Sequence, residues 1–186
     1  MLSLRPKREE IRSVLDLGTG TGCLLLAALS EYQEAFGVGV DLSPAAAALA
    51  CENASRNALA ERCAFLAGNW FSALRGQFDV ILSNPPYIRA TDLDGLMPEV
   101  RDHEPERALI GGEDGLDDYR RLLAQAKAHL APQGIMIFEI GRGQEPDVRA
   151  LAEEAGFTLR EARADLAGIV RALCFEHASA RLCVQS

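Results

Sequence analysis

The chain of 186 residues has little of what marks membrane, secreted or disulfide-bonded proteins. No apolar run approaches the roughly 20 residues of a membrane-spanning helix, so no membrane partner is expected. The basic N-terminus lacks the apolar stretch of a secretory signal. The five cysteines are scattered, odd in number and without a Cys-x-x-Cys pair, a pattern typical of reduced thiols. We therefore expect a cytoplasmic protein.

Histidine and basic residues are scarce as well. The three histidines (His103, His129 and His177) lie far apart without the spacing of metal ligands, so no metal site is predicted. Lys and Arg number 19 against 27 Asp and Glu, which gives a formal net charge of -8. Proteins that bind nucleic acid usually carry a basic face. Nucleic acid is therefore an unfavoured partner.

What the chain does contain is a regular alternation of strand-like and helix-like segments. We expect strands at 13–17, 36–40, 63–66, 78–82, 134–140, 157–164 and 169–176, and helices at 23–32, 44–57, 116–130 and 146–155. Alternating strands and helices of this length are typical of βαβ units and a doubly wound sheet. The last two strands predict an antiparallel hairpin at the sheet edge. We predict an α/β protein with one domain at 13–177, a poorly packed segment at 1–12 and a tail at 178–186.

A glycine-rich turn joins the first predicted strand to the first helix. It reads Gly18-Thr19-Gly20-Thr21-Gly22, with Asp16 before it and Asp41 at the end of the next strand. A carboxylate at the position of Asp41 can accept hydrogen bonds from both hydroxyls of a ribose. The glycines allow the main chain to approach a ligand closely. A plain tight turn and a nicotinamide dinucleotide site are the alternatives, although the Gly-x-Gly-x-Gly spacing counts against the second. S-adenosylmethionine is the favoured ligand, because its cationic sulfonium and amino groups match the negative charges of Asp16 and Asp41.

A second motif, Asn84-Pro85-Pro86-Tyr87, ends the fourth predicted strand. The prolines have no N–H, and Pro86 keeps the residue before it extended. An amide oxygen and a main-chain carbonyl can hold both hydrogens of a planar NH2 group while the ring of Tyr87 stacks on its face. The alternative is an ordinary strand-ending turn.

Trp70 follows Asn69 at the end of the third strand. The indole can stack on an adenine, or it can simply cover the core. A long irregular stretch then spans 89–115, beyond the carboxyl end of the fourth strand, where α/β folds bind ligands. The carboxylates at 92–118 suggest a solvated or partner-facing loop rather than a metal cluster.

Together, the motifs resemble the class I S-adenosylmethionine-dependent methyltransferases. The Asn-Pro-Pro-Tyr form belongs to enzymes that methylate an adenine amino group or a glutamine amide. The segments 96–105, 111–116 and 139–144 are similar to the glutamine-N5 methyltransferases of peptide chain release factors (the HemK/PrmC family). The resemblance implies a Rossmann-like, mostly parallel seven-stranded sheet between two helical layers. It places cofactor contacts at Gly18, Thr19, Gly20, Thr21, Gly22, Asp41, Trp70 and Asn84. It places substrate contacts at Asn84, Pro85, Pro86 and Tyr87, with Asn84, Pro85 and Tyr87 as the catalytic residues.

The resemblance implies S-adenosylmethionine as cofactor and the Gly-Gly-Gln loop of a release factor as substrate. The sequence departs from the family pattern in two ways. Asn69 occupies a position where the family usually has Asp, and the chain has almost nothing of the family's N-terminal helical domain. It therefore resembles the catalytic domain alone. Two other functions stay open: an adenine-N6 methyltransferase, and a catalytically silent domain that binds a cofactor or a partner.

Overall fold

The computed structural model describes residues 11–91 and 110–178. The predictions for 1–10, for 92–109 of the long irregular stretch, and for most of the tail lie outside this part of the chain. The described elements, in order, are β1 (Ser13–Leu17), α1 (Cys23–Glu31), β2 (Phe36–Asp41), α2 (Pro44–Arg56), η2 (Ala60–Arg62), β3 (Cys63–Ala67), β4 (Phe78–Ser83), α4 (Asp117–His129), β5 (Leu130–Glu139), α5 (Glu145–Glu154), β6 (Phe157–Ala164) and β7 (Val170–His177).

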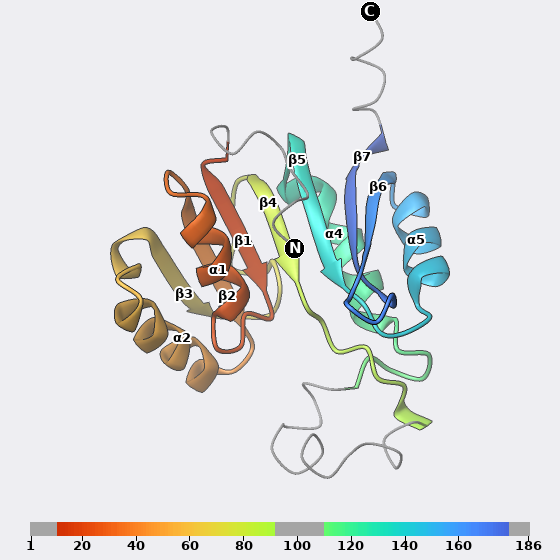
Figure 1. Cartoon of the computed structure of the whole chain (residues 1–186), viewed down its shortest axis with the longest axis horizontal. Helices are drawn as coiled ribbons and strands as arrows, with labels where there is room; N and C mark the ends of the chain where they lie inside the picture. The colour runs from red at the N-terminus through yellow and green to blue at the C-terminus, as the bar shows by residue number, and fades with distance from the viewer. Residues whose placement is uncertain (1–10, 92–109, 179–186) are drawn as a thin grey trace, which may run out of the picture.

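The seven strands form one sheet in the order β3-β2-β1-β4-β5-β7-β6 (Figure 1). The first five in this order pair in parallel, whereas β7 runs antiparallel to both of its neighbours. The order reverses between β1 and β4, so the carboxyl ends of these two central strands form the switch point of the sheet. Ligands of doubly wound folds bind at such a point. The predicted fold class and the edge hairpin are confirmed.

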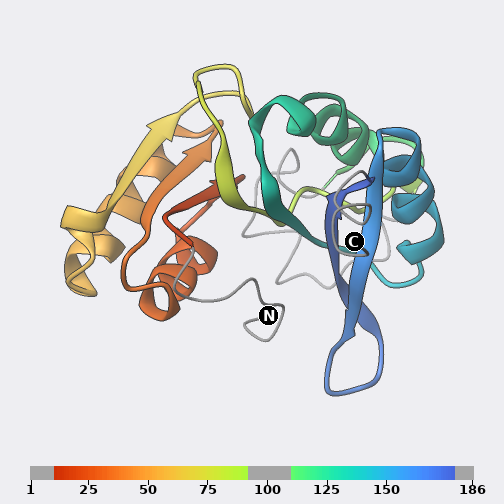
Figure 2. The ribbon, with the colours of Figure 1, turned by 90° about the horizontal axis from the view of Figure 1, so that it is seen from above.

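The two faces of the sheet are covered by different helices, as the view from above shows (Figure 2). Successive strand residues point to opposite faces. Leu15 of β1 therefore packs into a core with α4 and α5, while Val14 packs into a second core with α1 and α2. This arrangement gives the predicted three layers.

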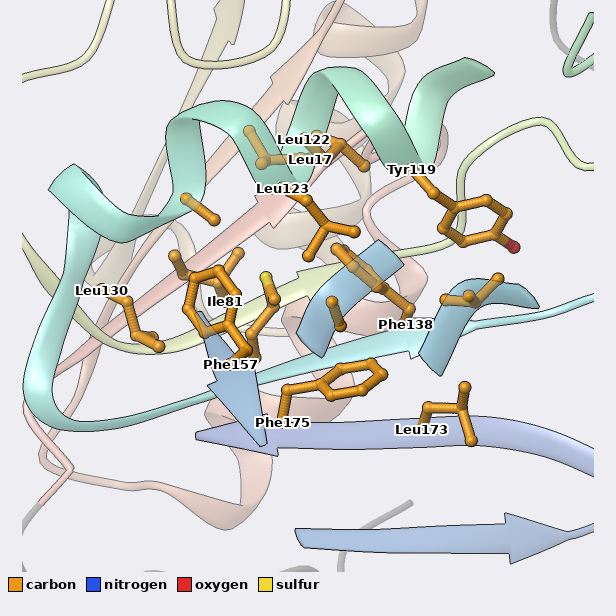
Figure 3. Packing of buried hydrophobic residues seen from close by; sticks show 14 of the residues in the cluster. Leu17, Ile81, Tyr119, Leu122, Leu123, Leu130, Phe138, Phe157, Leu173 and Phe175 are labelled. Atoms are coloured by element: carbon orange, nitrogen blue, oxygen red, sulfur yellow. The ribbon is translucent and has the colours of Figure 1, made fainter. Parts of the chain in front are cut away.

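The larger core lies between α4 and the strands β4, β5 and β7 (Figure 3). Tyr119 is fully buried there, and its ring meets Phe138 edge-on at a centroid distance of 5.6 Å. The Tyr119 hydroxyl donates a 2.8 Å hydrogen bond to the main-chain carbonyl of Glu139, the last residue of β5. The buried hydroxyl is thus satisfied, and α4 is fixed to the end of β5.

The structure moves two predicted boundaries. Ile11 is buried in the second core, so the packed part of the chain includes at least one residue of the segment 1–12. β5 begins at Leu130 rather than Gly134, because Leu130 pairs with Phe78 before a shift in register. Within the described residues, no helix is long and apolar enough to cross a membrane.

Candidate active site

The glycine loop (residues 18–22) is fastened to the end of β2 by main-chain hydrogen bonds. The N–H groups of Gly18 and Thr19 both donate to the Val40 carbonyl, at 2.8 and 3.0 Å. The N–H of Gly20 donates to Oδ2 of Asp41 at 2.8 Å. The turn and the carboxylate that the sequence singles out are therefore in direct contact.

Asp41 also organises the start of α2. Its Oδ1 accepts a 2.8 Å hydrogen bond from the N–H of Ser43, the N-cap of that helix. Each carboxylate oxygen thus has one main-chain donor, and each has lone pairs left for a further donor. A carboxylate held in this way can accept hydroxyl groups in a fixed geometry.

Asp16 is fully buried in β1, two residues before the glycine loop. The Thr19 hydroxyl donates to its Oδ2 at 2.7 Å, while Oδ1 has no hydrogen-bond partner among the described residues. Burial raises the pKa of Asp16 from 3.8 to about 6, although the Thr19 hydroxyl and the main-chain N–H of Leu25 oppose this shift. The charge of Asp41 raises the same pKa slightly further. A buried carboxylate with an unpaired oxygen fits a cationic ligand group.

The Asn-Pro-Pro-Tyr segment (residues 84–87) follows β4 directly. Ser83, the last residue of β4, is buried, and the exposed Asn84 stands at the strand's carboxyl end. Pro85 is buried again, and Pro86 and Tyr87 are half-buried. The segment therefore combines one exposed amide with an anchored main chain.

Trp70 connects the two motifs. Its ring lies against the glycine loop, since a Cβ placed on Gly18 would be 3.4 Å from a ring carbon and 4.0 Å from the carbonyl oxygen of Asn84. Trp70 adopts a φ of 49°, which is unusual for a residue other than glycine. The half-buried ring also packs against the larger core. The geometry is compatible with both predicted roles of Trp70. The neighbouring Asn69 is exposed.

A third segment, residues 111–115, lies alongside residues 84–90. The N–H of Gly111 donates to the carbonyl of Ile88 at 2.9 Å, and the N–H of Ala90 donates to the carbonyl of Gly112 at 3.0 Å. Ile88 and Ile110 also form an isolated parallel bridge. The described end of the irregular stretch therefore forms part of the wall beside the Asn-Pro-Pro-Tyr segment.

Sequence reasoning missed Gln144 as a site residue. Its carboxamide is buried and donates to the main-chain carbonyls of Tyr87 and Gly115, at 3.1 and 3.2 Å. These partners lie 57 and 29 positions away in the sequence. Because both are main-chain atoms, no residue type signals the contact. Only the similarity of segment 139–144 to the family pointed to this region.

Three of the four described carboxylates of the predicted acidic loop, Asp114, Asp117 and Asp118, pair with arginines. Arg120 donates to both oxygens of Asp114, at 3.1 and 2.6 Å, and also to Asp117 at 3.2 Å. Its hydrogen bonds lower the pKa of Asp114 to about 2. Arg121 forms an ion pair with Asp118 at 2.8 Å. These side chains have cationic partners within the protein.

The arrangement fits S-adenosylmethionine. Asp41 is oriented to accept ribose hydroxyls, Asp16 offers an unpaired buried oxygen to a cationic group, and the Trp70 ring offers a flat apolar surface. The segments that carry these groups lie at the carboxyl ends of β1, β2 and β3, and residues 84–87 follow the carboxyl end of the neighbouring β4 (Figure 1). The structure thus brings every sequence-predicted site residue to one end of the sheet. Their roles stay predictions.

Comparison with known proteins agrees with this arrangement. A protein from Rhodospirillum rubrum named release factor glutamine methyltransferase is 48% identical over 160 residues, which cover 86% of this chain and 49% of that protein. A protein of the same name from Agrobacterium fabrum is 46% identical over 168 residues, covering 90% and 58%. The crystal structure of ribosomal protein L11 methylase from Lactobacillus delbrueckii subsp. bulgaricus superimposes with a TM-score of 0.66 at 23% identity, covering 95% of this chain and 72% of that one. This structural likeness shows the fold alone.

The chain spans about half the length of these two sequence relatives. Their similarity confirms the resemblance that the motifs indicate, and it runs through nearly all of the chain. The profile of the family described as Methyltransferase small domain matches residues 1–97, which include the glycine loop, Asp41, Trp70 and the Asn-Pro-Pro-Tyr segment. The chain therefore belongs to the methyltransferase small domain family.

Proposed function

We propose that the chain is an S-adenosylmethionine-dependent methyltransferase that acts on the side-chain amide nitrogen, N5, of a glutamine. The substrate is a peptide chain release factor in the cytoplasm, methylated in its Gly-Gly-Gln loop. Two relatives at 46–48% identity carry the name release factor glutamine methyltransferase, which supports this choice of substrate. The acidic composition also favours a protein over a nucleic acid.

One observation carries the proposal. The exposed Asn84 lies at the carboxyl end of β4, and both its main-chain carbonyl and the Trp70 ring lie beside Gly18 of the glycine loop. The methyl-donor residues and the predicted NH2-binding residues therefore share one switch point of the sheet. A transfer reaction needs this proximity, because the two reacting groups must be held in line.

The substrate side of the mechanism rests on residues 84–87. A glutamine amide nitrogen is a weak nucleophile, since its lone pair is delocalised into the carbonyl group. The side-chain oxygen of Asn84 and the main-chain carbonyl of Pro85 each accept one N–H of the amide, and Tyr87 stacks on its plane. Two acceptors fixed in this way stabilise the positive charge that develops on the nitrogen. Positioning and preorganised electrostatics then provide most of the rate acceleration.

The cofactor side rests on the glycine loop, Asp16, Asp41 and Trp70. When bound, S-adenosylmethionine would supply an electrophilic methyl group, with S-adenosylhomocysteine as the leaving product and one amide proton released to solvent. Asp41 would hold the ribose, and Trp70 would stack on the adenine. The negative charge of Asp16 would compensate the positive charge of the methionine part.

The proposal is tested by incubating the chain with methyl-labelled S-adenosylmethionine and, in separate reactions, with a release factor or with DNA. Label on the release factor is the expected result. Label on DNA alone would favour the adenine-N6 alternative. Cofactor binding without transfer to either substrate would favour the catalytically silent domain. Asn84→Ala serves as the control for transfer at this site.

A further inference from the structure

Gln144 makes three side-chain hydrogen bonds beside the candidate site. It stands at the N-cap of α5 but makes no capping hydrogen bond with its side chain. Its Oε1 accepts the N–H of Gly141 at 2.9 Å, while Nε2 donates to the carbonyls of Tyr87 and Gly115. Only 6% of Gln144 is exposed. Both N–H groups of a buried carboxamide are therefore satisfied by main-chain carbonyls.

The three bonds join three separate parts of the wall around residues 84–87. Tyr87 ends the Asn-Pro-Pro-Tyr segment, Gly115 ends the segment that precedes α4, and Gly141 belongs to the turn after β5. Gln144 thus holds the carbonyl of Tyr87 against two neighbouring turns. The bonds of residues 111 and 112 to residues 88 and 90 fix the chain just beyond Tyr87 as well.

The glycines at this junction allow the close packing. A Cβ at position 115 would lie 2.5 Å from the Tyr87 carbonyl oxygen and 2.9 Å from Nε2 of Gln144. A Cβ at position 141 would lie 2.7 Å from Oε1 of Gln144 and 2.9 Å from Cδ2 of the Tyr87 ring. All four separations are too short for a real Cβ atom. The main chain and the ring of Tyr87 are therefore enclosed by Gln144 and these two glycines.

We infer that Gln144 is a positioning residue for the reaction, which fixes the main chain and ring of Tyr87 in the place where the substrate amide binds. The inference rests on the proposed function for its effect on rate. None of the three side-chain hydrogen bonds of Gln144 reaches the glycine loop or Asp41. Its loss therefore lowers kcat and leaves the affinity for S-adenosylmethionine nearly unchanged.

The chemistry at this position requires a donor. Gln144→Glu keeps the size of the side chain, but a carboxylate has no hydrogen to donate. Two carbonyl oxygens, those of Tyr87 and Gly115, would then face a negatively charged group. Protonation of the new side chain at acidic pH restores one donor. The activity of this variant relative to wild type therefore rises as the pH falls, which a purely space-filling role would not produce.

The experiment compares wild type with Gln144→Ala, Gln144→Glu and the exposed matched control Gln125→Ala. It measures kcat with a release factor, the affinity for S-adenosylmethionine by calorimetry, and the NMR signal of fluorotyrosine at Tyr87. Only three tyrosines are present, so Tyr87→Phe assigns the signal and Tyr32 serves as an internal reference. We expect both Gln144 variants to lose roughly tenfold or more in kcat at pH 8, with cofactor affinity within about twofold of wild type. The Tyr87 signal should shift, and Gln125→Ala should match wild type.

Wild-type kcat in a folded Gln144→Ala variant would overturn the inference. So would parallel losses of kcat and cofactor affinity, or a Tyr87 signal that does not move. If wild type itself transfers no methyl group to release factor, the proposed function fails instead. The Tyr87 signal then decides the inference about Gln144, because it is measured without turnover.

Discussion

The hydroxyl of Ser83 donates a 2.7 Å hydrogen bond to the main-chain carbonyl of Leu17, and both residues are buried. Leu17 is the last residue of β1, and Ser83 is the last residue of β4. The glycine loop begins immediately after the first, and Asn84 immediately follows the second. This bond therefore joins the two strand ends from which the glycine loop and the Asn-Pro-Pro-Tyr segment start, and so fixes their relative positions.

Ser83→Ala removes the hydroxyl donor and leaves the carbonyl of Leu17, at the buried end of β1, without this hydrogen bond. We expect the free energy of unfolding to fall by about 1–2 kcal/mol, with a smaller loss of activity. Urea denaturation of both proteins measures the change. Ser55→Ala, which removes an exposed hydroxyl bonded to the carbonyl of Cys51, is the control and should change stability by less than about 0.5 kcal/mol. Equal effects of the two substitutions would remove the structural role of Ser83.

Asn84→Ala removes the side-chain acceptor proposed for the substrate amide. We expect kcat to fall by about two orders of magnitude or more, because one fixed acceptor for developing charge is lost. Binding of S-adenosylmethionine should weaken far less, which calorimetry can measure. Asn57→Ala, at the exposed end of α2, should behave as wild type. Near-normal turnover of Asn84→Ala would contradict the proposed mechanism.

Asp41→Ala should act on the cofactor. The substitution removes the ribose acceptor and also the bonds to the N–H groups of Gly20 and Ser43, so affinity should fall roughly tenfold or more. Trp70 is the sole tryptophan, and its fluorescence offers a direct titration if the adenine stacks on it. Asp147→Ala on the exposed side of α5 is the matched control. Unchanged affinity in Asp41→Ala would exclude the ribose role.

Asp16 should make the stability of the cofactor-free protein depend on pH. Its pKa in the folded protein, about 6, lies above the ordinary 3.8, so the folded state binds the proton more tightly than the unfolded state does. The contribution of Asp16 to the free energy of unfolding therefore falls as the pH rises from 3.8 to about 6, by on the order of 3 kcal/mol in total. Urea denaturation across this range, compared with Asp16→Asn, measures the effect. Identical pH profiles of the two proteins would contradict it.

Asp16 should also make the affinity for the cofactor depend on pH, in the direction opposite to its effect on stability. The charged form of Asp16 attracts a cationic ligand, so affinity for S-adenosylmethionine should be highest above pH 6 and should fall as the carboxylate is protonated. Asp16→Asn should bind more weakly at neutral pH and lose this pH dependence. Calorimetry at pH 5 and pH 8 distinguishes the two behaviours.

The sheet could be predicted from the sequence because its strands are short apolar runs with clear ends. The glycine turn and the two prolines marked the ends of β1 and β4, and these ends define the site. The start of β5 could not be predicted, because Pro132 and Gly134 suggest a turn. Leu130 belongs to the strand through its pairing with Phe78, which lies far away in the sequence, and through its burial in the larger core.

Asp41 and Asn84 could be named as candidate site residues from the sequence, because the type of side chain itself suggests the interaction. A site residue could not be predicted where it acts on main-chain atoms. Gln144 satisfies carbonyls of Tyr87 and Gly115, and Ser83 that of Leu17. Any residue type offers the same carbonyl, so only the three-dimensional arrangement identifies these contacts.

The central claim is that the NH2 group held at Asn84 belongs to a glutamine side chain. Mass spectrometry of a release factor after incubation with the chain and S-adenosylmethionine tests it most directly, with Asn84→Ala as the parallel reaction. The account predicts one added methyl group on the glutamine of the Gly-Gly-Gln loop with wild type and almost none with Asn84→Ala. An unmodified glutamine in a reaction where the wild-type chain binds the cofactor, or methylation that does not depend on Asn84, would contradict it.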